Sequence, residues 1–90
     1  MMETNEVFEE LKLYLTADPE HEVPEERGMG LNPDDVTMDA KLEEDLDIDS
    51  LGIVEIVMWA EDKWGIEVDD EELEEVITIG QAVNVLHSKI

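Results

Sequence analysis

The fold follows most directly from the segment Leu46-Asp47-Ile48-Asp49-Ser50-Leu51, which leads into the most strongly patterned helix of the chain. Asp49 or a neighbouring residue is expected to cap this helix, because an aspartate carboxylate accepts hydrogen bonds from the free N–H groups of a first helical turn. Ser50 then falls within that turn, with carboxylates and no base around it. This setting favours a serine that is chemically modified over a serine that attacks a substrate.

The helix that begins here is predicted to run to about Trp64 and to stop at Gly65, since glycine commonly follows a helix end. Its apolar side chains fall on two separate faces when each residue is turned by about 100°. The face expected to enter the core contains Ile53, Ile56, Val57, Ala60 and Trp64. The second face, which mixes apolar side chains with carboxylates, contains Leu51, Val54, Glu55, Met58 and Asp62. We interpret it as a candidate contact surface, because a purely solvated face would not need apolar residues. The alternative is a set of unrelated exposed side chains.

Three further helices are predicted from apolar spacing and capping signals. The first spans about residues 4–15, and the third is a short helix in the acidic stretch 69–76. The last begins after Thr78, where Thr-x-x-Gln has the form of a capping box. Its expected buried residues are Ala82, Val83, Val85, Leu86 and Ile90. No segment alternates for long enough to predict a strand. The expected fold class is therefore all-α, a four-helix bundle with a short third helix.

A long loop is predicted between the first two helices, at about residues 16–48. Its part from Ala17 to Gly30 combines prolines, glycines and like charges, which disfavour regular structure. Asn32 then fits an N-cap and Pro33 the first position of one short helical turn. Trp59, which lies on neither face of the second helix, is expected to pack under this loop.

The composition limits the function classes that the chain could serve. Its 90 residues predict a single domain spanning 1–90, and 42% hydrophobic content indicates a real core. The formal charge of -22 excludes direct binding to nucleic acid and favours partners with basic surfaces. No apolar run is long enough for a membrane span, no secretory signal is found, and cysteine is absent, which together predict a cytoplasmic protein.

Residues 45–50 do not meet the requirements of two other kinds of site, a calcium-binding loop and a hydrolytic serine. Asp45, Asp47 and Asp49 repeat the opening spacing of an EF-hand calcium loop, but its sixth position needs glycine and is Ser50. No specific metal site is therefore predicted. A hydrolytic serine would need a nearby base, and the two histidines, His21 and His87, lie far from it in the sequence. Both are expected to be ordinary surface residues.

A set of ordered motifs covers roughly residues 34–87. These motifs are Asp35-Val36-Thr37, Leu42-Glu43-Glu44-Asp45-Leu46, Asp49-Ser50-Leu51, Val54-Glu55-Ile56-Val57-Met58, Trp64-Gly65-Ile66-Glu67-Val68, and Thr78-Ile79 with Ala82-Val83. In their order and spacing the chain resembles the acyl carrier proteins of fatty acid and polyketide synthesis. The resemblance implies the acyl carrier type of four-helix bundle, with a long first loop and a short third helix.

The resemblance also implies a function. Ser50, flanked by Asp49 and Leu51, would receive 4'-phosphopantetheine from coenzyme A through a phosphodiester that a phosphopantetheinyl transferase installs. The chain would carry acyl groups as thioesters on this arm, as a monomer without catalytic activity of its own. Acyl-loading and acyl-processing enzymes would dock through basic patches onto Leu51, Val54, Glu55, Met58 and Asp62. An acyl chain folded back between the helices would be lined by Ile53, Ile56, Val57, Ala60 and Leu73, unless these residues are plain core.

Two departures from the family pattern leave the pathway and the acyl cargo open. Gly52 stands where the common fatty acid carriers have an acidic residue, and the first loop is lengthened around Pro19 to Gly30. A specialised carrier is therefore expected nearly as much as a housekeeping one. The other functional alternatives are an aminoacyl or peptidyl carrier, and an acidic adaptor that binds proteins without a prosthetic group.

Overall fold

A computed structural model describes residues 2–90 and shows four α-helices, the first two of which are joined by a long loop. The helices are α1 (Thr4–Thr16), α2 (Ser50–Trp64), α3 (Asp70–Leu73) and α4 (Ile79–Lys89). Two short 3₁₀ turns, η1 (Pro24–Glu26) and η2 (Pro33–Asp35), lie within the loop. Residues 2–90 form no strand. One isolated β-bridge pairs Lys41 with Thr78. The predicted all-α, four-helix architecture with a short third helix is confirmed.

The helix ends follow the capping signals of the sequence. The Asn32 side chain accepts a hydrogen bond from the backbone N–H of Asp34, as expected for the short turn η2. Thr78 and Gln81 form the predicted capping box at the start of α4. Gly65 adopts a left-handed conformation with φ 64° and ends α2, a geometry that glycine reaches without steric cost.

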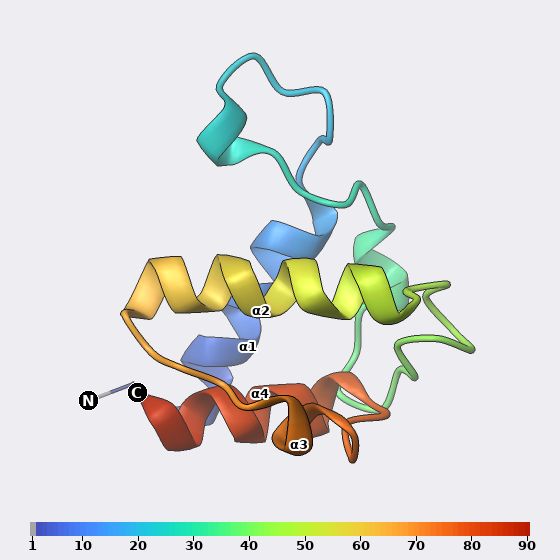
Figure 1. Ribbon diagram of the computed structural model, residues 1–90. Helices are drawn as coiled ribbons and strands as arrows, with labels where there is room; N and C mark the ends of the chain where they lie inside the picture. The colour runs from blue at the N-terminus through green and yellow to red at the C-terminus, as the bar shows by residue number, and fades with distance from the viewer. Residues whose placement is uncertain (1) are drawn as a thin grey trace.

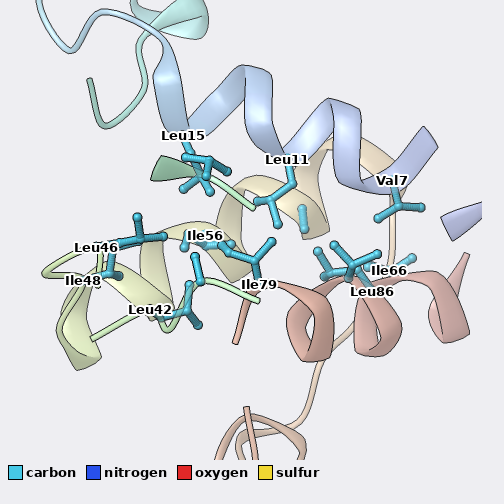
Figure 2. Packing of buried hydrophobic residues seen from close by; sticks show 14 residues of the cluster. Val7, Leu11, Leu15, Leu42, Leu46, Ile48, Ile56, Ile66, Ile79 and Leu86 are labelled. Carbon is cyan, nitrogen blue, oxygen red and sulfur yellow. The ribbon is translucent and has the colours of Figure 1, made fainter. Parts of the chain in front are cut away.

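The hydrophobic core lies where α1, α2 and α4 meet (Figure 1). Val7, Leu11 and Leu15 of α1 repeat at helical spacing and are fully buried. Figure 2 shows Val7 and Leu11 pointing toward the side chains of Leu86 and Ile79 on α4. Because every buried side chain of the described residues is apolar, the core needs no internal polar pairing. No described helix is long and apolar enough to cross a membrane.

The second half of the long loop belongs to this core. Its buried side chains are Val36, Ala40, Leu42, Leu46 and Ile48. Backbone hydrogen bonds tie the loop to the start of α4, with Ile79 donating to the carbonyl of Ala40 over 2.9 Å and Leu42 donating to Ile77 over 2.9 Å. The second half of the loop therefore fixes the position at which α2 begins relative to α4.

The first half of the loop is an excursion that closes on the end of α1. The N–H of Gly30 donates to the carbonyl of Ala17 over 2.8 Å, which brings the two ends of the segment together as in an Ω-loop. None of its residues is buried, and Figure 1 shows it standing out beyond α2. Trp59 lies beside it, as expected, but its main partner is Tyr14 of α1, whose ring stacks on it with centroids 4.7 Å apart.

Three residues near the end of the chain differ from the expectation. Ile79 is fully buried, although it was not among the predicted core residues of the last helix. Ile90 was expected to be buried but is 41% exposed, because α4 ends at Lys89 and Ile90 follows that end. His87 was expected to be an ordinary surface residue, yet it is half-buried, and its Nε2 lies 2.9 Å from the carbonyl oxygen of Met2.

Candidate functional site

Ser50 is the first residue of α2 and is exposed. Asp49 caps the helix, since its Oδ1 accepts a 2.9 Å hydrogen bond from the backbone N–H of Gly52. None of the side-chain hydrogen bonds among the described residues involves the Ser50 hydroxyl. The local sequence therefore holds the serine backbone firmly while leaving its hydroxyl free to be reached from outside.

The turn that precedes Ser50 is fixed by buried apolar side chains and backbone hydrogen bonds. Leu46 and Ile48 are buried, and the N–H of Ile48 donates to the carbonyl of Leu42 over 2.8 Å. Between them Asp47 has φ 58°, a left-handed conformation that aspartate tolerates better than most residues. Alternating exposure along 46–49 thus directs the apolar side chains inward and Asp47 and Asp49 outward.

Gly52 packs directly against this turn. A Cβ added to Gly52 would lie 2.7 Å from Cγ2 of Ile48, which is closer than such carbon atoms approach each other. Ile48 is one of the core residues labelled in Figure 2. The absence of a side chain at Gly52 therefore allows the buried Ile48 to contact the first turn of α2.

The electrostatic setting of Ser50 suits attachment of a phosphate group more than acid–base catalysis. The first N–H groups of an α-helix lack partners within the helix and favour negative charge. His21 and His87 are engaged elsewhere, with the N–H of Val23 and the carbonyl of Met2 respectively. Among residues 2–90, no cluster of three or more potential ligands is arranged to hold a metal ion. The site thus offers an exposed nucleophilic oxygen at a helix end without a neighbouring base.

The two faces of α2 separate as the sequence predicted. Ile56, Val57 and Ala60 are buried, while Ile53 and Trp64 are half-buried at the edges of the same face. The predicted contact face is exposed along its whole length, from Leu51 at 68% to Met58 at 58%. Its remaining members, Val54, Glu55 and Asp62, are exposed as well. The structure therefore places an apolar and acidic surface directly beside Ser50.

A small apolar cavity lies between α2, α3 and α4. Its volume is about 20 Å³, which leaves room for about one water molecule. The lining residues are Leu42, Ile53, Ile56, Val57, Val68, Leu73, Val76, Ala82, Val85 and Leu86. Four of the five residues proposed from the sequence line it, whereas Ala60 is fully buried elsewhere in the core.

An open groove adjoins the cavity on the side of the long loop. Leu42, Ile53 and Val76 line both spaces, and Asp47 belongs to the groove. The groove has a volume of about 650 Å³, and its lining also includes Lys41, Glu43 and Glu44 of the loop. Sequence reasoning did not identify Leu42 or Val76 as lining residues, because the helical periodicity that reveals a buried face does not extend into loops.

Comparisons with known proteins agree with this geometry. Residues 27–86 match the protein family described as "Phosphopantetheine attachment site". The chain is also 42% identical over 62 residues to the acyl carrier protein of Petrotoga mobilis (strain DSM 10674 / SJ95), covering 69% of this chain and 73% of that protein. The chain therefore belongs to the acyl carrier proteins, which carry acyl groups on a covalently bound phosphopantetheine.

Proposed function

We propose that Ser50 is the residue to which 4'-phosphopantetheine is attached. The observation that carries this proposal is the exposed Ser50 hydroxyl at the first position of α2, beside the cap formed by Asp49. The chain has no cysteine, so the bound group supplies the thiol on which acyl thioesters form. The chain's own residues hold the attachment point and present it to other enzymes. A free thiol on the arm persists in a reducing compartment, and the cytoplasm is the compartment that we propose.

The exposed face of α2 is the proposed docking surface for the transferase and for acyl-loading and acyl-processing enzymes. Leu51, Val54 and Met58 supply apolar contacts, and Glu55 and Asp62 supply charge for a basic patch on the partner. Acidic side chains from Asp69 to Glu75 extend the negative surface. Electrostatic complementarity raises the association rate more than the affinity, which suits a carrier that must leave each enzyme again.

The small cavity is the proposed destination of an acyl chain that folds back from Ser50. Its lining is apolar, and the adjoining groove leads toward the loop that ends at Ser50. At about 20 Å³ the cavity accommodates an acyl chain only if its walls move apart. Burial of the chain would therefore be coupled to a movement of the surrounding helices.

The attachment site is tested by incubating the apo protein with coenzyme A and a broad-specificity phosphopantetheinyl transferase. We expect a gain in intact mass equal to one phosphopantetheinyl group. The chain has only two serines, so Ser50→Ala should abolish the gain and Ser88→Ala should leave it unchanged. No gain for the wild-type protein, while a known carrier is modified in parallel, would refute the assignment.

The docking face is tested by reversing one charge on α2. Glu55→Lys should lower kcat/KM for the transferase by about three- to tenfold, because it places a cation opposite a basic patch. Glu9→Lys on α1 changes the net charge equally at another exposed position and is the matched control. Equal effects of the two substitutions would show that only overall charge matters.

The acyl class and the pathway are tested by loading. We propose service in fatty acid, polyketide or related biosynthesis, and not the aminoacyl or peptidyl alternative, because the contact face of α2 carries acids for basic partners. Holo protein offered to an acyl transferase and to an amino acid-activating enzyme should accept acyl groups only. The adaptor without a prosthetic group is set aside by the family match.

A further inference from the structure

The walls of the apolar cavity differ in whether they contain buried core residues. The walls on α2 and α4 contain buried core residues, namely Ile56, Val57 and Leu86. They also contain half-buried residues, namely Ile53, Ala82 and Val85. The third wall consists of Val68, Leu73 and Val76, which are only half-buried. This wall includes α3, a helix of four residues. Because the cavity has room for only about one water molecule, an acyl chain enters only if a wall moves, and this wall is the least buried.

The segment that forms the third wall is anchored firmly at both of its ends. At its start, the N–H of Val68 donates to Oε2 of Glu61 over 3.1 Å. At its end, the N–H of Ile77 donates to Oε1 of Gln81 over 2.7 Å, and its carbonyl accepts from Leu42. The middle of the segment, where Leu73 lines the cavity, depends on a different contact.

That contact is made by Glu72. Its Oε2 accepts a 3.2 Å hydrogen bond from the N–H of Asp69, which closes the capping box of α3. Its Oε1 lies 2.7 Å from Nζ of Lys89 in the last turn of α4, the shortest ion pair among the described residues. The hydrogen bond from Lys89 lowers the pKa of Glu72, and the same bond raises the pKa of Lys89. One carboxylate thus joins the start of α3 to the end of α4.

We propose that the Glu72–Lys89 pair is a clasp that limits how far α3 moves away from α4, and that it thereby selects which acyl chains the cavity admits. This proposal rests on the proposed function, in which an acyl group attached through Ser50 folds back between the helices. The side chains of Glu72 and Lys89 remain 34% and 30% exposed. The ion pair is therefore strong enough to favour the position of α3 next to α4, and weak enough to break when α3 moves away.

The free energy of the Glu72–Lys89 ion pair is similar to the free energy gained by burying one more methylene group of an acyl chain. An exposed ion pair shifts an equilibrium by about two- to fivefold. Burial of one methylene group shifts an equilibrium by about fourfold. Loss of the clasp should therefore act on the buried fraction as if the acyl chain were about one methylene longer. The effect should be largest for chains that are only partly buried in the wild-type protein.

The clasp itself is tested on the apo protein by amide hydrogen exchange. Lys89→Met removes the ion pair, and Glu72→Gln removes its charge while keeping an acceptor for the capping box. In both variants we expect exchange at residues 70–76 to become about two- to fivefold faster. Lys41→Met is the matched control, because it removes the same charge from an ion pair with Glu44 outside α3 and α4. Unchanged exchange at 70–76, or an equal change in Lys41→Met, would overturn the clasp.

Selection of acyl chains is tested on protein loaded with butyryl, octanoyl or dodecanoyl phosphopantetheine from the corresponding coenzyme A thioesters. Nuclear Overhauser contacts between the acyl methyl group and the methyl groups of Leu73 and Val76 report burial. We expect Lys89→Met and Glu72→Gln to raise the buried fraction by about two- to fivefold for the chain of intermediate burial. If the buried fraction depends on acyl chain length in the same way in the wild-type protein and both variants, the clasp does not select acyl chains. Failure of every variant to gain a phosphopantetheinyl group would instead refute the role of Ser50. The hydrogen-exchange experiment on the apo protein would still show whether the Glu72–Lys89 pair holds α3.

Discussion

Ile48 packs against Gly52 so closely that a Cβ on Gly52 would lie 2.7 Å from Cγ2 of Ile48. The contact joins the end of the long loop to the first turn of α2, two residues after Ser50. From the sequence, Gly52 counted as a departure from the acidic residue that common fatty acid carriers have there. The structure gives this glycine a packing role, so its presence does not by itself indicate a specialised pathway.

Gly52→Ala should destabilise the protein, although alanine is the better helix former by about 1 kcal/mol. The new Cβ forces the stiff, β-branched Ile48 side chain to move, and such overpacking typically costs about 1–3 kcal/mol. Urea unfolding of Gly52→Ala, Ile48→Ala and the double variant measures the coupling. The double variant should lose less than the sum of the single variants. A stabilised Gly52→Ala protein would contradict the tight contact.

Gly28→Ala should release the Ω-loop formed by residues 17–30. A Cβ at Gly28 would collide with the carbonyl oxygen of Tyr14, so the backbone must move away from α1. We expect faster trypsin cleavage after Arg27, the only basic residue of the loop apart from His21, with a small loss of global stability because no loop residue is buried. Val23→Ala is the control, since Val23 is exposed at the tip of the loop. Equal cleavage rates in the two variants would show that the close approach is unimportant.

Tyr14 should titrate above its ordinary pKa, which is about 10. Burial against Trp59 raises the pKa of Tyr14, and the nearby negative charge of Glu55 raises it further. A raised pKa means that the folded state favours the neutral phenol. The corresponding stability is complete below the pKa of the unfolded state and is lost as the pH rises through that of the folded state.

The titration is simple to measure, because Tyr14 is the only tyrosine. Ultraviolet absorbance should give a higher midpoint for the folded protein than for the protein in urea. Glu55→Gln should reduce the difference without abolishing it, because burial is the larger cause. A folded midpoint at or below the unfolded one would contradict the stacking of Tyr14 on Trp59.

Added salt or a millimolar divalent cation should raise the melting temperature. Residues 39–75 contain 16 carboxylates against Lys41 and Lys63, and screening reduces their mutual repulsion. No described group of residues forms a specific metal site, so calcium and magnesium should act to a similar extent at equal concentration. Melting curves that do not respond to salt or to either cation would show that this repulsion does not limit stability.

Much of the local structure could be predicted because the deciding signals act within a few residues. The cap at Asp49, the capping box of Thr78 and Gln81, and the left-handed Gly65 each involve neighbours in sequence. The two faces of α2 followed from helical periodicity alone. The buried state of Leu42 and Ile48 could not be derived in this way, because loop residues have no period that marks an inward side.

The helices, the exposed serine at the start of α2 and the separation of the two faces of this helix could all be derived from the amino-acid sequence alone. The contacts between distant elements could be seen only in the folded chain: Tyr14 on Trp59, Glu72 with Lys89, and His87 with the carbonyl of Met2. These two kinds of contact differ in the sequence distance between their partners. Hydrogen bonds within a helical turn depend on adjacent residues, whereas these contacts exist only after the shared core has fixed the relative positions of the helices.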